Sequence, residues 1–141
     1  MSERKYLQDL TKQIKQECPA VTWVKIGDSF GGHKRIDVFA FWQFHGFIIE
    51  FKLEGNDLEG EQLEYLKNAS QSAYCFVGSF FMPEGTRHCR ALRFQPVGPA
   101  GVIQEQEYIL TWDKGQYRGL PALMPALLSL GWLAKKTTFF L

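Results

Sequence analysis

The sequence predicts an α/β fold with a mixed central sheet, whose elements follow in the order α-β-β-β-α-β. Three observations lead to this prediction: apolar residues at helical spacing near the N-terminus, short apolar runs separated by glycines, and a second helical pattern followed by a buried strand. Strands joined by a short turn are antiparallel, whereas a strand that follows a helical crossover runs parallel to its predecessor. Both kinds of pairing are expected here.

The first helix is expected over residues 3–17, where four apolar residues fall on one face, namely Tyr6, Leu7, Leu10 and Ile14. Three strands should follow, over residues 21–26, 35–43 and 47–53. The second and third are close enough to form an antiparallel hairpin, with a turn near His45-Gly46. Loop residues 27–32, which contain three glycines, separate the first strand from this hairpin.

Residues 58–71 form the second predicted helix, and residues 74–81 a buried strand parallel to the third. Beyond Pro83 the pattern is weaker. It favours a further hairpin over 90–97 and 102–112, then a short helix over about 120–130. The apolar segment 120–133 is interpreted as a helix covering the core, with a dimer interface as the alternative. We therefore expect one domain over residues 1–141, with a core at 3–81 and a C-terminal extension at 82–141.

Composition narrows the class of protein. With 141 residues and 45% hydrophobic content, the chain can bury one substantial core. The net charge of +1 gives no general attraction to a polyanion, so any binding to nucleic acid must come from a local patch. Three scattered cysteines and the lack of a secretory pattern predict a cytoplasmic protein without a disulfide framework. Residues 120–133 fall short of the roughly 18 apolar residues that a membrane-spanning helix needs, so no membrane anchor is expected.

The triplet Glu50-Phe51-Lys52 interrupts an apolar run, and Asp37 opens the apolar run before it. An unpaired charge is costly to bury, so charges inside an apolar strand need compensation. Alternation along a strand places Glu50 and Lys52 on one face, and the hairpin places Asp37 on the neighbouring strand. One interpretation is a half-buried strand with a polar side. The other is a metal site.

The metal interpretation suits phosphodiester hydrolysis, which needs an activated water and neutralisation of charge at phosphorus. Mg²⁺ prefers carboxylate and backbone oxygens, which Asp37, Glu50 and the carbonyl of Phe51 would supply. Lys52 would orient or help deprotonate the attacking water and stabilise the developing charge.

This combination resembles the PD-(D/E)xK nucleases, and more specifically their virus-type replication-repair nuclease (VRR-NUC) branch, which is related to archaeal-type Holliday-junction resolvases. The resemblance covers residues 3 to about 80, with Glu3, Gly32 and Gln62 at places that match the branch. Where the family has a proline before the aspartate, this chain has Ile36. The resemblance implies a restriction-endonuclease-like core and a Mg²⁺- or Mn²⁺-dependent DNA endonuclease, with branched DNA in repair or recombination as one candidate substrate. It also implies that Glu3 supports the metal and that Gln62 positions the catalytic carboxylate or a phosphate.

Two basic segments are candidates for contact with DNA. His33, Lys34 and Arg35 follow two glycines in the loop before Asp37, and the densest basic stretch contains Arg87, His88, Arg90 and Arg93. Phosphate neutralisation by these residues would make binding strongly dependent on salt. The alternative for both segments is a solvated charged surface. The aromatic residues Phe39, Phe41, Trp42 and Phe44 are interpreted as core and hairpin packing rather than as a platform for base stacking.

Other functions stay open from the sequence alone. The chain is alternatively a non-catalytic protein that binds nucleic acid or a partner on the same scaffold, or a structural module of a larger assembly. Junction cleavage needs two symmetric cuts, so an enzyme specific for branched DNA is expected to be a homodimer. A strict monomer would instead favour a flap, single-strand or nonspecific nuclease.

Overall fold

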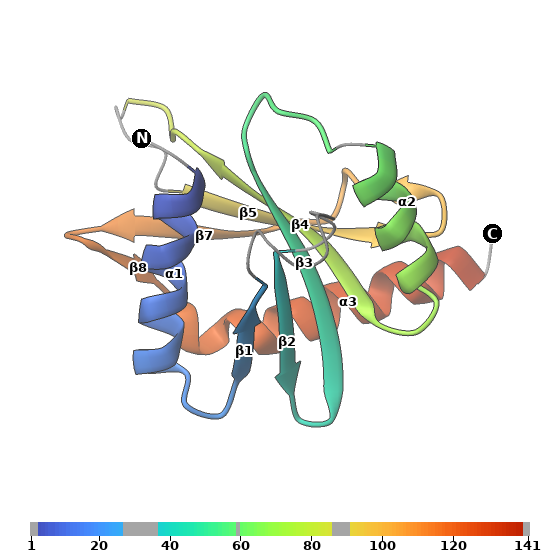
Figure 1. Cartoon of the computed structure of the whole chain (residues 1–141), viewed down its shortest axis with the longest axis horizontal. Coiled ribbons are helices and arrows are strands. Elements are labelled where there is room, and N and C mark those ends of the chain that lie inside the picture. The colour runs from blue at the N-terminus through green and yellow to red at the C-terminus, as the bar shows by residue number, and fades with distance from the viewer. Residues whose placement is uncertain (1–2, 27–36, 59, 86–90, 140–141) are drawn as a thin grey trace.

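A computed structural model of the chain describes residues 3–26, 37–58, 60–85 and 91–139, with side chains described up to residue 136. The elements of these residues are α1 (Glu3–Glu17), β1 (Thr22–Lys25), β2 (Val38–Trp42), β3 (His45–Leu53), α2 (Gly60–Ala69), β4 (Tyr74–Phe81), β5 (Ala91–Gly98), β6 (Gly101–Val102), β7 (Tyr108–Asp113), β8 (Gln116–Arg118), the 3-10 turn η1 (Leu120–Ala122) and α3 (Leu123–Phe139). Figure 1 shows their arrangement. The predicted order α-β-β-β-α-β is confirmed for α1 to β4.

The eight described strands form one mixed sheet in the order β1-β2-β3-β4-β5-β7-β8, with β6 paired to the end of β5. Strands β2 and β3 are antiparallel, as predicted for the hairpin. Strand β4 lies parallel to β3, because α2 carries the chain back over the sheet between them. Strand β3 therefore lies inside the sheet, between β2 and β4.

The turn between β2 and β3 was predicted at His45-Gly46, and this is wrong. The turn residues are Gln43 and Phe44, both with positive φ (48° and 66°), while His45 already pairs with Trp42. Two successive residues with positive φ are typical of the two-residue hairpin turn whose twist matches that of the flanking strands. The glycine of the segment thus lies inside β3 and not in the turn.

The C-terminal part of the chain extends the same sheet. Strand β5 pairs with β4, but the predicted strand 102–112 is wrong as one element, because it is divided into β6 and β7. The final helix was also predicted too short, since α3 continues to Phe139. Pro125 is tolerated because it lies in the first turn of α3, where backbone N–H groups have no partner within the helix.

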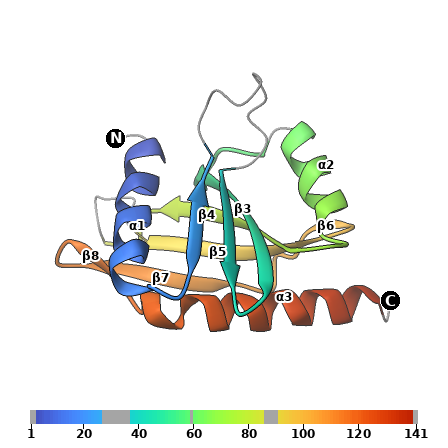
Figure 2. The same ribbon diagram turned by 60° about the horizontal axis from the view of Figure 1, so that its bottom comes forward.

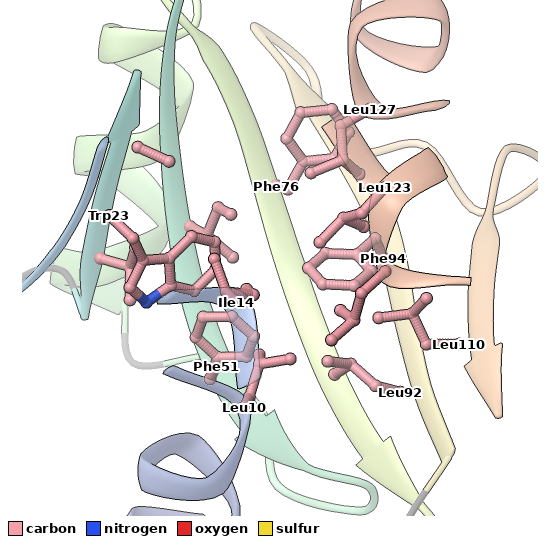
Figure 3. Close-up of a cluster of buried hydrophobic side chains, with 14 of the residues drawn as sticks. Leu10, Ile14, Trp23, Phe51, Phe76, Leu92, Phe94, Leu110, Leu123 and Leu127 are labelled. Atoms are coloured by element: carbon pink, nitrogen blue, oxygen red, sulfur yellow. The ribbon is translucent and has the colours of Figure 1, made fainter. Parts of the chain in front are cut away.

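Helices cover both faces of the sheet (Figure 2), with α3 along one side and α2 on the other. The larger core lies under α1 and α3, and its apolar residues include Leu10 and Ile14 of α1 and Leu123 and Leu127 of α3. Figure 3 shows these side chains packed against Phe51 and Phe94 of the sheet. The predicted buried face of α1 is confirmed. Among the described helices, none combines the length and the apolar character needed to cross a membrane.

The opposite face carries a smaller cluster under α2. Its buried members are Leu66, Cys75, Val77 and Val97, and Ile48 and Phe39 pack against them. Since alternate residues of a strand face opposite sides, Ile48, Glu50 and Lys52 share the α2 side of β3. The charged residues of the triplet therefore lie next to an apolar cluster.

Candidate active site

The triplet is held by the packing of its middle residue. Phe51 is fully buried and lies in ring contact with Phe80, Trp23 and Phe94, with ring centroids 5.6, 6.3 and 6.0 Å away. Because neighbouring residues of a strand point to opposite faces, anchoring Phe51 in the larger core directs Glu50 and Lys52 to the α2 side. The buried Phe51 thus orients the two charged residues of the triplet.

Asp37 lies directly before β2, the strand that pairs with the triplet's strand β3. The register pairs Val38 with Ile49, so continuing it by one residue places Asp37 opposite Glu50. Residues directly opposite in an antiparallel pair project to the same face. Oδ2 of Asp37 accepts a 2.7 Å hydrogen bond from the backbone N–H of Phe51, which holds the carboxyl against the triplet.

Glu50 is the most deeply buried charged group in the described part of the chain, with only 3% of its surface exposed. Its Oε1 accepts a 2.7 Å hydrogen bond from Nε2 of Gln62, a buried residue of α2. Nζ of Lys52 lies 3.8 Å from the same oxygen. Oε2 is buried and has no hydrogen-bond partner among the described residues. One oxygen of this carboxyl is therefore held by Gln62, and the carboxyl also lies within hydrogen-bonding reach of the Asp37 side chain.

These surroundings change the acidity of the site. Burial raises the pKa of Glu50, and together with the negative charge of Asp37, a side-chain hydrogen bond with Asp37 and the negative charge of Glu3 it brings this pKa to about 9, against the opposing positive charge of Lys52. Burial also raises the pKa of Glu3, with a further contribution from the charge of Asp37. In the protein without a cation, Glu50 thus holds a proton at neutral pH. A positive ion between the carboxyls would favour their ionised forms.

The donors that the structure brings together suit a hard divalent cation. Asp37 and Glu50 provide carboxylate oxygens, which Mg²⁺ and Mn²⁺ prefer, and the two carboxyls lie close enough to raise the pKa of Glu50. Glu3 comes within electrostatic reach of both. Within residues 3–26, 37–58, 60–85 and 91–139, however, no three His, Cys, Asp or Glu side chains gather closely enough to hold a metal. The metal-supporting role of Glu3 stays a prediction.

The predicted DNA-contacting residues mostly lie outside the described part of the chain. This applies to His33, Lys34, Arg35, Arg87 and Arg90, and also to Gly32, Ile36 and His88. Arg93 is described, and it forms ion pairs with Glu54 and Glu107. Sequence reasoning did not single out these two glutamates, because nothing in the local sequence indicates that strand pairing brings them to Arg93.

The four aromatic residues of the hairpin differ from one another. Phe39 and Trp42 pack against the two apolar clusters, as predicted. Phe44 is fully exposed, so the prediction that it packs is wrong, whereas Phe41 is half exposed and its ring lies beside Gly46 of the paired hairpin strand. Phe44 is a turn residue with positive φ, and its side chain is fully exposed.

Comparison with known proteins gives likenesses among solved structures. No protein-family model and no curated protein matches the chain. Among solved structures, the chain is similar to Hjc, a Holliday junction resolvase from the archaeon Archaeoglobus fulgidus, with 17% sequence identity and a TM-score of 0.47. The match covers 66% of this chain and 75% of that one. The chain's membership of the virus-type branch stays a prediction. The proposal for its function rests on the geometry of the site.

Proposed function

We propose that this protein is a Mg²⁺- or Mn²⁺-dependent DNA endonuclease that hydrolyses phosphodiester bonds, with branched DNA as its preferred substrate. The observation that carries the proposal is the state of Glu50: it is buried, its pKa is raised to about 9, and it lies beside a second carboxyl and an ammonium group. Such an arrangement is destabilising without a ligand. Strongly perturbed carboxyls of this kind are typical of functional sites.

In this proposal Asp37 and Glu50 hold the cation, with the carbonyl of Phe51 as a further donor. When bound, the ion would polarise the phosphate and lower the pKa of a water molecule. Lys52 donates hydrogen bonds from Nζ, which orient the attacking water and offset the charge that develops on the phosphate oxygens. Gln62 keeps the Glu50 carboxyl in one orientation through its hydrogen bond to Oε1. Glu3 adds negative charge near the cation.

A cleavage assay tests the reaction. Purified protein is incubated with branched, flapped, duplex and single-stranded DNA in Mg²⁺ or Mn²⁺, and we expect cleavage of branched DNA first. Asp37→Asn and Lys52→Ala should each lower the rate at least about 100-fold, the usual cost of removing a preorganised charged group from an active site. Glu64→Gln and Lys67→Gln are matched controls, since these residues form an exposed ion pair on α2. Full cleavage by either site variant would overturn the proposal.

Ion binding separates an enzyme from a DNA-binding protein that lacks catalysis. Calorimetric titration with Mn²⁺ should show binding to the wild type, weaker binding to Glu50→Gln, and no change for Glu64→Gln. A wild type that binds DNA but not Mn²⁺ would favour the non-catalytic alternative. Light scattering adds the oligomeric state, because paired cuts across a junction require a two-fold dimer.

A further inference from the structure

A row of side chains continues from the candidate active site across the sheet. The strand register pairs Lys52 of β3 with Ser79 of β4, and Ser79 with Arg93 of β5. Paired residues project to the same face, so all three lie on the α2 side. Neighbouring strands are about 4.8 Å apart, which places the backbone of Arg93 roughly 10 Å from that of Lys52.

Helix α2 covers only part of this face. The apolar cluster beneath it contains Cys75 and Val77 of β4 and Val97 of β5, and none of its members comes from the row of Ser79 and Arg93. Next to Arg93 on β7, Ile109 remains exposed. Ser79 and Arg93 are themselves partly exposed, so within the described residues this part of the sheet beside Lys52 is reached by solvent.

Arg93 supplies a positive charge in this open part of the sheet, and three contacts fix the position of its side chain. Its guanidinium carbon lies 4.4 Å above the centre of the Phe81 ring. Nε lies 3.0 Å from Oε2 of Glu107, and Nη1 lies 3.7 Å from Oε1 of Glu54. The Arg93 side chain is 26% exposed, whereas the side chains of Glu54 and Glu107 are 55% and 42% exposed. The cation is therefore oriented by a ring and two solvated carboxylates.

Because both carboxylates are largely solvated, their ion pairs with Arg93 contribute little to stability, and another anion can replace them at the exposed part of the guanidinium. A phosphate suits the planar guanidinium well, because two of its oxygens can accept parallel hydrogen bonds. Lys52 alone offers one positive charge to a substrate that carries a charge on every nucleotide. A second cation on the same face, two strands away, extends the surface for a phosphodiester backbone.

We propose that Arg93 is a second phosphate-binding residue, which binds the DNA backbone beside the phosphate that is cleaved. Glu54 and Glu107 hold the guanidinium in the free protein and are displaced from it by the DNA phosphate. This inference rests on the proposed nuclease function. It assigns to Arg93 a role in substrate binding and not in the chemical step.

Salt-dependent DNA binding tests the assignment. All variants are made in a Lys52→Ala background, so that the DNA stays intact, and affinity for branched and duplex DNA is measured by fluorescence anisotropy over a range of salt. Arg93→Gln should weaken binding about tenfold, as expected for one charge-assisted hydrogen bond. It should also reduce the slope of log affinity against log salt by about 0.9, because one phosphate contact is lost. Lys67→Gln removes an equal charge elsewhere and should change neither value.

Two further variants keep the test decisive if Arg93→Gln fails to fold, as judged by circular dichroism. Arg93→Lys should retain the salt slope but weaken binding about threefold, because it loses the paired hydrogen-bond geometry. Glu107→Gln should tighten binding about threefold more than Glu64→Gln does, because it removes a competing exposed ion pair. Unchanged affinity in both would overturn the role of Arg93.

The outcomes also separate this inference from the proposed function. If the wild type cleaves DNA and Arg93→Gln leaves affinity and slope unchanged, only the assignment of Arg93 is wrong. If the wild type neither binds nor cleaves any DNA, the proposed function fails, and this inference fails with it.

Discussion

The side-chain amide of Gln62 donates a 2.7 Å hydrogen bond to Oε1 of Glu50, and both residues are buried. This bond connects α2 to the middle of β3, on the face of the sheet that carries the candidate active site. An amide donor is suited to this place because it satisfies one carboxyl oxygen without adding a charge. The orientation of Glu50 is thereby coupled to the docking of α2.

Replacing Gln62 with leucine should affect both stability and activity. Without its donor, the buried Oε1 of Glu50 keeps only the ammonium of Lys52 at 3.8 Å. We expect the free energy of unfolding to fall by about 1–3 kcal/mol, the usual cost of leaving a buried polar group unsatisfied. Urea denaturation measures this change. Asn68→Ala on the exposed side of the same helix serves as control, and equal effects of the two substitutions would contradict the role of the hydrogen bond.

The stability of the cation-free protein should fall as pH rises. The unfolded Glu50 carboxyl loses its proton near its ordinary pKa of 4.5, whereas the folded one keeps it until a pKa of about 9. Between these values the folded state binds more protons, so the free energy of unfolding decreases with pH, by at most about 1.4 kcal/mol per unit. The favourable contribution is fully present below pH 4.5 and is lost as the pH passes through about 9.

Urea denaturation at pH 5, 7 and 9 in the presence of a chelator measures this slope. Glu50→Gln cannot ionise, so its free energy of unfolding should vary less with pH, and the variant should become more stable than the wild type toward pH 9. Glu64→Gln should keep the slope of the wild type. Parallel curves for the wild type and Glu50→Gln would show that Glu50 titrates normally.

Substituting Gly78 should disturb the triplet from the other side of the sheet. A Cβ at Gly78 would lie 2.7 Å from two ring carbons of Phe51 and 3.5 Å from a methyl group of Leu92. Because Phe51 is packed on several sides by other rings, its ring has little room to move, and Gly78→Ala should cost about 1–3 kcal/mol of stability. The shift of Phe51 should also reduce cleavage, since Glu50 and Lys52 flank it.

Thermal denaturation and the cleavage assay together measure this effect. Gly46→Ala is the matched control, because a Cβ there would meet Phe41 at an ordinary contact distance of 3.7 Å. A Gly78→Ala protein with wild-type stability and activity would show that the sheet adjusts without moving the triplet.

Much of the first half of the fold is readable from local patterns. The helical spacing of Leu10 and Ile14 predicts α1, and the alternation around Phe51 predicts which side chains of β3 face the same way. The parallel pairing of β3 with β4 follows from the helix between them. The position of Gly46 did not predict the hairpin turn correctly, because the twist of the paired strands placed the turn at Gln43 and Phe44 instead.

The second half was harder to predict, because its strands lack a regular alternation and their pairing partners are distant in sequence. The split between β6 and β7 and the length of α3 depend on packing against β4 and β5. The same holds for Arg93, whose place in a row with Lys52 follows from the registers of two strand pairs.

The groups with unusual chemistry can be recognised in the sequence: two acids and an amine are set in apolar strands, where a compensating interaction is needed. The compensating partners are seen only in the folded protein. The Phe51 N–H lies against Asp37, the Gln62 amide lies against Glu50, and the carboxyls of Asp37 and Glu50 lie close enough to raise the pKa of Glu50. The physical reason is that strand pattern sets the direction of a side chain, whereas burial and partners depend on elements that meet it only after folding.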